Sequence, residues 1–167
     1  MINKVKPFIL FAAVFVAAIA VDLIVKAVCE GVNSAFLPHI ISIYSVHNYG
    51  IAWSMLSNAG VWLAIFTGLL TVAAVAVWVV LKKRNLRAAR RGTLVDLGFA
   101  FFIGGALGNL IDRIFLGYVR DFLRLEFWPS FPIFNMADLF LNVGVVILAV
   151  YFLFFFDKER KNANNQG

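Results

Sequence analysis

Charged side chains are scarce in this sequence. They make up 14% of its 167 residues, whereas soluble proteins contain about 25%. Hydrophobic residues make up 62% of the chain, and this composition excludes an ordinary soluble domain. The sequence therefore predicts a membrane protein.

Cysteine and histidine are nearly absent as well. Cys29 is the single cysteine, which excludes an intrachain disulfide and a cysteine-rich metal site. It follows an apolar segment, but Val28 stands where a lipoprotein signal peptide needs a small residue, so we interpret this segment as a retained helix. The two histidines, His39 and His47, lack the H-x-x-x-H spacing of a helical metal site. We therefore expect no metal site.

Four long apolar segments account for most of the chain. They span residues 7–28, 61–81, 94–115 and 137–156, and each is close to the roughly 20 residues that a helix needs to cross a bilayer. No internal repeat is evident, and the segments leave no room for a separate soluble domain. We predict an all-α membrane protein with four transmembrane helices that form one domain over residues 1–167.

Basic residues are unevenly distributed between the connections. They precede the first segment, cluster at residues 82–91 and follow the fourth segment, whereas residues 27–81 contain no Lys or Arg. The positive-inside rule then places both termini and the 82–92 loop in the cytoplasm, and the loops 29–60 and 116–136 outside. The net charge of +6 reflects this topology, and we expect no nucleic-acid partner.

The outward loop 29–60 is longer than a helical hairpin requires. Its residues 40–46 are rich in β-branched and aromatic side chains, which predicts short strands on the outer membrane surface. Residues 36–43 offer an apolar face that could rest on lipid headgroups, contact a lipidated ligand or pack against the helix ends. The second outward connection contains aromatic residues and the prolines Pro129 and Pro132, which is typical of an interfacial loop.

The polar residues of the apolar segments converge on one leaflet. An ionised side chain at membrane depth costs roughly 2.5 to 3.5 kcal/mol even on a lenient scale, so such residues indicate function. The predicted orientation of the segments brings the following to their outer ends: Asp22 and Lys26; Asn109, Asp112 and Arg113; Asn135 and Asp138; and Asp121 just beyond the third segment. We therefore predict a single site near the outer surface.

Some of these residues have structural interpretations. Asp22 and Lys26 are four residues apart, which predicts an ion pair with Lys26 extending outward. Asp112 is expected to pair with Arg113, and a carboxylate beside a guanidinium is a poor proton donor. Asp96 is assigned to the cytoplasmic interface. The small residues at 104–108 predict close helix packing, or the close approach of an extended peptide.

The chemistry that these residues favour is a pair of carboxylates. Two close Asp side chains share one proton, so that one can act as base toward water while the other protonates a carbonyl. A nucleophile pair of Lys26 with Ser54 or Ser57 is conceivable, but no local motif joins them. A small proton-coupled transporter is the main alternative, and a structural adaptor is the third. A transporter would place its polar residues at the bilayer midplane, whereas the polar residues of this sequence gather at one end of the helices.

Four short motifs occur in order along the chain: NYGIAWS at 48–54, GGALGNLIDR at 104–113, GYVRDF at 117–122 and FNMAD at 134–138. Together with Asp22 and Lys26, they closely resemble the bacterial lipoprotein signal peptidases, the type II signal peptidases. The resemblance extends over nearly the whole chain and includes the number of helices.

The resemblance implies an aspartic endopeptidase of the bacterial cytoplasmic (inner) membrane. Such an enzyme removes signal peptides from diacylglyceryl-modified prolipoproteins, before the lipidated cysteine, without a metal or organic cofactor. By motif position, Asp121 and Asp138 correspond to the catalytic pair. The supporting or substrate-binding positions are Asp22, Lys26, Asn48, Gly50, Asn109, Asp112, Arg113, Asn135 and Ala137. We expect a monomer whose partners are its lipidated substrates and membrane lipids.

Overall fold

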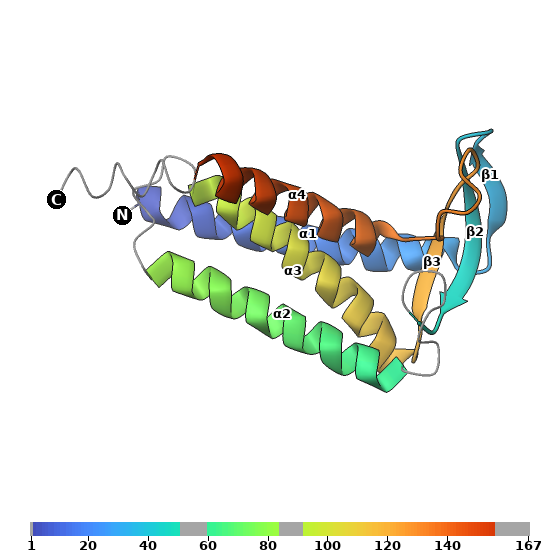
Figure 1. Cartoon of the computed structure of the whole chain (residues 1–167), viewed down its shortest axis with the longest axis horizontal. Helices are drawn as coiled ribbons and strands as arrows, with labels where there is room; N and C mark the ends of the chain where they lie inside the picture. Colours follow the sequence, from blue (N-terminus) through green and yellow to red (C-terminus); the bar gives the residue numbers. More distant parts are fainter. Residues whose placement is uncertain (1, 51–59, 84–91, 156–167) are drawn as a thin grey trace.

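The computed structural model describes residues 2–50, 60–83 and 92–155. These residues form four long helices and a small sheet (Figure 1). The helices are α1 (Ile2–Cys29), α2 (Gly60–Lys83), α3 (Gly92–Phe115) and α4 (Met136–Phe154). Each is long and apolar enough to cross a membrane. The four predicted spans are confirmed, although α1 begins five residues earlier than expected and α4 ends two residues earlier.

Helices α1, α3 and α4 pack against one another, and α2 packs on α3 (Figure 1). Small residues on α3 permit this close packing, as the sequence predicted. A Cβ added to Gly105 would collide with the main chain of α4 at Ala137 and Leu141, while one added to Gly104 would press on α1 at Ala18. Without a hydrophobic driving force between helices in lipid, such close contacts stabilise the bundle through van der Waals packing.

A three-stranded antiparallel sheet lies at one end of the bundle (Figure 1). Its strands, in spatial order, are β1 (Asn33–Leu37), β2 (Ile41–Asn48) and β3 (Val119–Leu125). The strands expected near residues 40–46 are confirmed. β3 was not predicted, since its residues were assigned to an irregular connection. The alternation of buried and exposed side chains that marks a strand is weak here, because both Asp121 and its neighbour Phe122 are buried.

The apolar face at residues 36–43 is exposed over its first part and half-buried at residues 41–43. Every residue of β1 is exposed, and Phe36 and Ile40 expose 64% and 51% of their surface. The exposed part of this face is available to lipid headgroups or to a lipidated ligand. Phe127 and Trp128 in the second outward connection are also exposed, as an interfacial loop requires.

The far end of the bundle contains a separate ion pair whose carboxylate is buried. Asp96, near the start of α3, is 1% exposed, accepts a hydrogen bond from Trp78 Nε1 at 2.9 Å and pairs with Lys82. The sequence assigned Asp96 to the cytoplasmic interface, where a carboxylate can stay in water. Its side chain is instead enclosed, because two side chains of α2 satisfy it. The pair joins α2 to α3 away from the sheet.

Candidate active site

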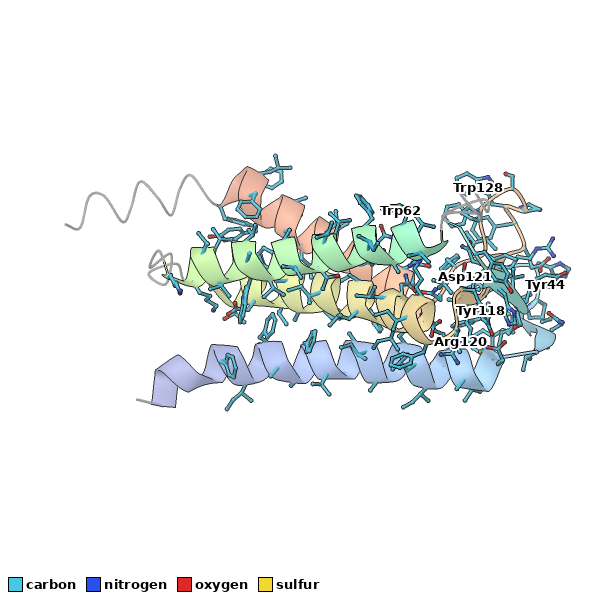
Figure 2. The ribbon with its side chains drawn as sticks, turned by 90° about the horizontal axis from the view of Figure 1, so that it is seen from below. Tyr44, Trp62, Tyr118, Arg120, Asp121 and Trp128 are labelled. Carbon is cyan, nitrogen blue, oxygen red and sulfur yellow. The ribbon has the colours of Figure 1, made fainter. Side chains whose placement is uncertain are left out.

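Asp121 is held by β3 at the junction of the sheet and the helices (Figure 2). The register of the sheet pairs β3 with β2 and brings Asn48 close to it. Asn48 Nδ2 donates to Asp121 Oδ2 at 2.8 Å, and Asn135 Nδ2 donates to Asp121 Oδ1 at 2.6 Å. The side chain is 4% exposed. Both carboxylate oxygens therefore accept amide hydrogen bonds in a nearly dry environment.

Asp138 lies in the first turn of α4. Asn135 is the N-cap of this helix, and the two residues form a capping box. The backbone N–H of Asn135 donates to Asp138 Oδ2 at 3.1 Å, and the backbone N–H of Asp138 donates to Asn135 Oδ1 at 3.0 Å. Asn109 Nδ2 donates to Asp138 Oδ1 at 2.7 Å. The capping box and α3 together orient this carboxylate.

Asn135 joins the two carboxylates. Its side-chain amide contacts Asp121, and its backbone N–H contacts Asp138. The same Nδ2 also donates to Asn109 Oδ1 at 3.0 Å, and Asn135 is fully buried. A short chain of amides therefore runs between the two carboxylates, and the negative charge of Asp138 acts on Asp121.

The environment of Asp121 raises its pKa to about 7. Burial is the main cause, since it disfavours the charged form, and the negative charge of Asp138 adds to it. The hydrogen bonds from Asn48 and Asn135 oppose this rise. At neutral pH, Asp121 can therefore both hold and release a proton, which suits acid/base chemistry.

Lys26 is fully buried and is connected to Asp138 through Asn109. Its Nζ lies 2.8 Å from Asp22 Oδ2 and 3.3 Å from Asp112 Oδ2, and it donates to Asn109 Oδ1 at 3.0 Å. The predicted pair with Asp22 is confirmed. The expectation that Lys26 extends outward is wrong, because three acceptors from α1 and α3 enclose its ammonium group.

Asp112 does not pair with Arg113 as the sequence predicted. Arg120 Nη2 donates to Asp112 Oδ1 at 2.8 Å, and Arg120 N donates to Asp112 Oδ2 at 3.0 Å. The side-chain bond to Asp112 raises the pKa of Arg120 above its usual value. Arg113 Nη2 instead donates to Gly50 O at 3.2 Å, and its charge acts on both Asp121 and Asp138. Adjacent residues on a helix point to different sides, so Asp112 finds its partner on β3 and Arg113 finds its partner in the chain just after β2.

Gly50 and Ala137 hold the site together through their backbones. Gly50 N donates to Asn48 Oδ1 at 2.9 Å, which orients the amide that binds Asp121. Ala137 N donates to Asp22 Oδ1 at 2.8 Å, so α1 caps the first turn of α4. Ala137 is fully buried, and its small side chain lets Gly108 of α3 approach closely.

One hydrogen-bonded and ion-paired network therefore contains all eleven residues that the sequence assigned to the site. Its members are Asp22, Lys26, Asn48, Gly50, Asn109, Asp112, Arg113, Asp121, Asn135, Ala137 and Asp138. Ser54 and Ser57, considered as partners for Lys26, lie outside the described residues. Within the described ranges, no three His, Cys, Asp or Glu side chains are grouped as a metal site would require.

Arg120 is a site residue that sequence reasoning missed. It links Asp112 to Glu30, whose Oε2 lies 3.8 Å from its Nε, and Glu30 Oε1 lies 2.6 Å from His47 Nε2. The His47 ring stacks on Tyr118, with ring centroids 3.9 Å apart. Figure 2 shows Tyr118 and Arg120 beside Asp121. The position of Arg120 next to Asp121 in the sequence was the signal that could have indicated its role. Its use required β3 to be recognised first, since only then can each of the two side chains be assigned to a face of the sheet.

Four membrane-length helices with carboxylates and amides joined at one end define a polytopic membrane protein with a site capable of acid/base chemistry. A family model described as signal peptidase (SPase) II matches residues 14–154. The chain belongs to the signal peptidase II family. Membership of a peptidase family leaves the transporter alternative without support.

Individual relatives agree with this assignment. The lipoprotein signal peptidase of Geobacillus thermodenitrificans (strain NG80-2) is 35% identical over 152 residues, which cover 87% of this chain and 91% of the relative. That of Ectopseudomonas mendocina (strain ymp) is 35% identical over 165 residues, covering 94% and 93%. A solved structure described as a bacterial membrane enzyme, determined by the in meso method at 1.9 Å resolution, matches with a TM-score of 0.71 and 27% identity, covering 87% of this chain and 93% of that one.

Proposed function

We propose that this protein is an aspartic endopeptidase that removes signal peptides from diacylglyceryl-modified prolipoproteins, cleaving before the lipidated cysteine. The observation that carries the proposal is the contact of one residue, Asn135, with both Asp121 and Asp138. It supports a paired action of the two carboxylates. Membership of the signal peptidase II family supports the type of substrate.

The two carboxylates perform the reaction on a water molecule. One carboxylate takes a proton from the water as its oxygen attacks the scissile carbonyl carbon, and the other supplies a proton to the carbonyl oxygen. A tetrahedral intermediate forms without a covalent acyl-enzyme. It collapses when the leaving nitrogen receives a proton and the C–N bond breaks. Neither a metal nor an organic cofactor takes part.

The enzyme acts in the bacterial inner membrane as one domain and as a monomer. Both termini lie in the cytoplasm, since the basic residues gather at that end of the helices. The site then lies near the outer leaflet, on the side of the sheet. A lipidated substrate remains in the membrane, and its cleavage site, just outside its own apolar helix, reaches the same depth. The exposed apolar residues of β1 contact membrane lipids or the lipid of the substrate.

Cleavage of a diacylglyceryl-modified prolipoprotein by the purified protein tests the proposal. Wild type should cleave, with or without EDTA, while Asp121→Asn and Asp138→Asn should each lose activity by at least about a hundredfold, the range of a lost acid/base group. Asp96→Asn is a matched control, because Asp96 is an equally buried carboxylate far from the site that keeps its bond from Trp78.

Near-normal turnover by either dyad variant would refute the assignment of the pair. An equal loss in Asp96→Asn would show that the assay reports folding rather than chemistry. A wild type that never cleaves a lipidated substrate would refute the proposed activity, and proton-coupled transport would then be the next property to measure.

A further inference from the structure

Lys26 has only acceptors around it. An ammonium group donates three hydrogen bonds and accepts none, and Lys26 Nζ faces the oxygens of Asp22, Asp112 and Asn109. The side chain is fully buried, so no water replaces these partners. Its charge is balanced by the two carboxylates, and its third bond goes to the neutral amide of Asn109.

That third bond helps to fix how the Asn109 amide is oriented. An amide presents an oxygen on one side and an NH2 group on the other, and its partners select which faces which. Because Lys26 can only donate, Asn109 Oδ1 must face it, at 3.0 Å. Asn109 Nδ2 is then turned toward Asp138 Oδ1, at 2.7 Å. Lys26 and Asn135, which both donate to Asn109 Oδ1, therefore turn the Asn109 NH2 group toward Asp138.

The Asn135 amide is oriented in the same sense. Its Oδ1 accepts the backbone N–H of Asp138, which can only donate. Its Nδ2 then points to Asn109 Oδ1 and to Asp121 Oδ1. Reversal of the Asn109 amide would place two NH2 groups face to face, so the whole chain of amides keeps one direction.

The two carboxylates are unequal in this arrangement. Asp138 accepts a backbone N–H and lies in the first turn of α4, where the helix dipole favours negative charge. Burial of Asp138 opposes its ionisation, and the hydrogen bonds from Asn109 and Asn135 and the charges of Lys26 and Arg113 act against that effect. Asp121 lies on a strand and is less exposed to solvent, and the charge of Asp138 acts against its ionisation.

We infer that Lys26 is a positioning residue that acts through Asn109 to keep Asp138 ionised, so that Asp138 is the base and Asp121 carries the proton. This inference rests on the proposed peptidase function. The charged groups that interact with Asp138 are Lys26 from α1, Arg113 from α3 and Asp121 from β3. The carboxylates of Asp22 and Asp112 lie against Lys26, and the neutral Asn48 of β2 is bonded to Asp121.

Each proton transfer of the reaction then has a defined donor and acceptor. Asp138 takes a proton from water as the water oxygen bonds to the carbonyl carbon, and Asp121 gives its proton to the carbonyl oxygen. In the second half, Asp138 passes the proton to the leaving nitrogen as the C–N bond breaks, and Asp121 regains a proton from a hydroxyl of the intermediate. Both carboxyl groups return to their starting states.

The pH dependence of kcat/KM for a lipidated substrate tests the inference. The acid limb reports ionisation of Asp138, and the alkaline limb, near pH 7, reports loss of the Asp121 proton. In Lys26→Gln, the positive charge that acts on Asp138 is lost, and Asn109 Oδ1 no longer faces an ammonium donor. We expect the acid limb to move upward by about one pH unit, a roughly tenfold loss below the limb. Lys26→Arg, which also only donates, should keep the wild-type limb.

Lys82→Gln is the matched control, since it also removes a lysine from a buried carboxylate, Asp96. It should leave both limbs unchanged. If Lys26→Gln is too unstable to assay, the double variant Asp22→Asn/Lys26→Gln preserves the charge balance, and an asparagine at residue 22 still accepts from Ala137 N. It should show the same upward shift.

A uniform loss of activity at all pH values in the Lys26 variants would overturn the inference, because it would show a structural role alone. The wild-type profile is a test in itself: activity that rises as the pH passes 7 would mean that Asp121 must lose its proton to act, and would also overturn it. Either result leaves the peptidase function intact. Only an inactive wild type would refute that function.

Discussion

Replacement of Asp121 by asparagine should stabilise the protein while abolishing its activity. The pKa of Asp121 is raised from 3.8 to about 7 by burial and by the charge of Asp138. Below about pH 4 the carboxyl group is protonated in the folded and unfolded states, so it costs nothing. Between about pH 4 and 7 the unfolded chain releases the proton and the folded chain keeps it, so stability is lost as the pH rises. Above about pH 7 the cost is constant.

The size of this change in stability follows from the size of the rise in the pKa of Asp121. An increase of the pKa from 3.8 to about 7 corresponds to roughly 4 kcal/mol at about pH 8, since each tenfold change in acidity is worth about 1.36 kcal/mol. An asparagine at this position forms only one of the two bonds that Asp121 accepts from Asn48 and Asn135, because its own NH2 group faces a donor. That loss costs about 1 kcal/mol. Asp121→Asn should therefore gain about 3 kcal/mol at about pH 8 and lose about 1 kcal/mol at about pH 4.

Thermal unfolding in detergent, followed by circular dichroism at pH 4, 6 and 8, measures this crossover. Tm of the variant should lie slightly below that of wild type at pH 4 and clearly above it at pH 8. Asp96→Asn serves as the control for removing a buried carboxylate elsewhere. A variant whose Tm stays parallel to that of wild type from pH 4 to 8 would refute the idea that the charge of Asp121 destabilises the folded chain.

Other substitutions test the packing and the hydrogen bonds of the site. Gly105→Ala should cost about 1 to 3 kcal/mol and reduce cleavage, because the added Cβ collides with the main chain of α4; Gly68→Ala, on open α2 with its nearest neighbour 3.9 Å away, should leave Tm and cleavage almost unchanged. Asn135→Ala should cost about 1 to 2 kcal/mol for the lost cap and also lower kcat, and a loss of stability without a loss of kcat would contradict its role as the bridge. Arg120→Ala should cost about 1 to 3 kcal/mol because Asp112 loses its bidentate partner but keeps Lys26 and the backbone N–H of residue 120. Arg124→Ala, which removes a side chain stacked over the exposed ring of Tyr44, should change Tm little by comparison.

The sequence by itself determined the membrane architecture. The four helices could be located because crossing a bilayer requires about 20 apolar residues, and this requirement acts on each segment separately. The residues of the site could be located for a similar reason: Asp22, Lys26 and Asn109 are costly at membrane depth and so stand out from their apolar surroundings. Neither prediction needs knowledge of which side chains touch.

Only the tertiary structure decided the hydrogen-bond and ion-pair partners of the site residues. Asp112 pairs with Arg120 across the end of the bundle and not with its neighbour Arg113, because β3 turns back over the end of α3. Lys26 is enclosed and not extended outward, because Gly108 lets α4 approach α1 and α3 closely enough to exclude water. The bridge from Asn135 to both carboxylates likewise depends on where α4 begins. Composition and spacing act along the chain, whereas hydrogen-bond partners are selected by packing between segments far apart in it.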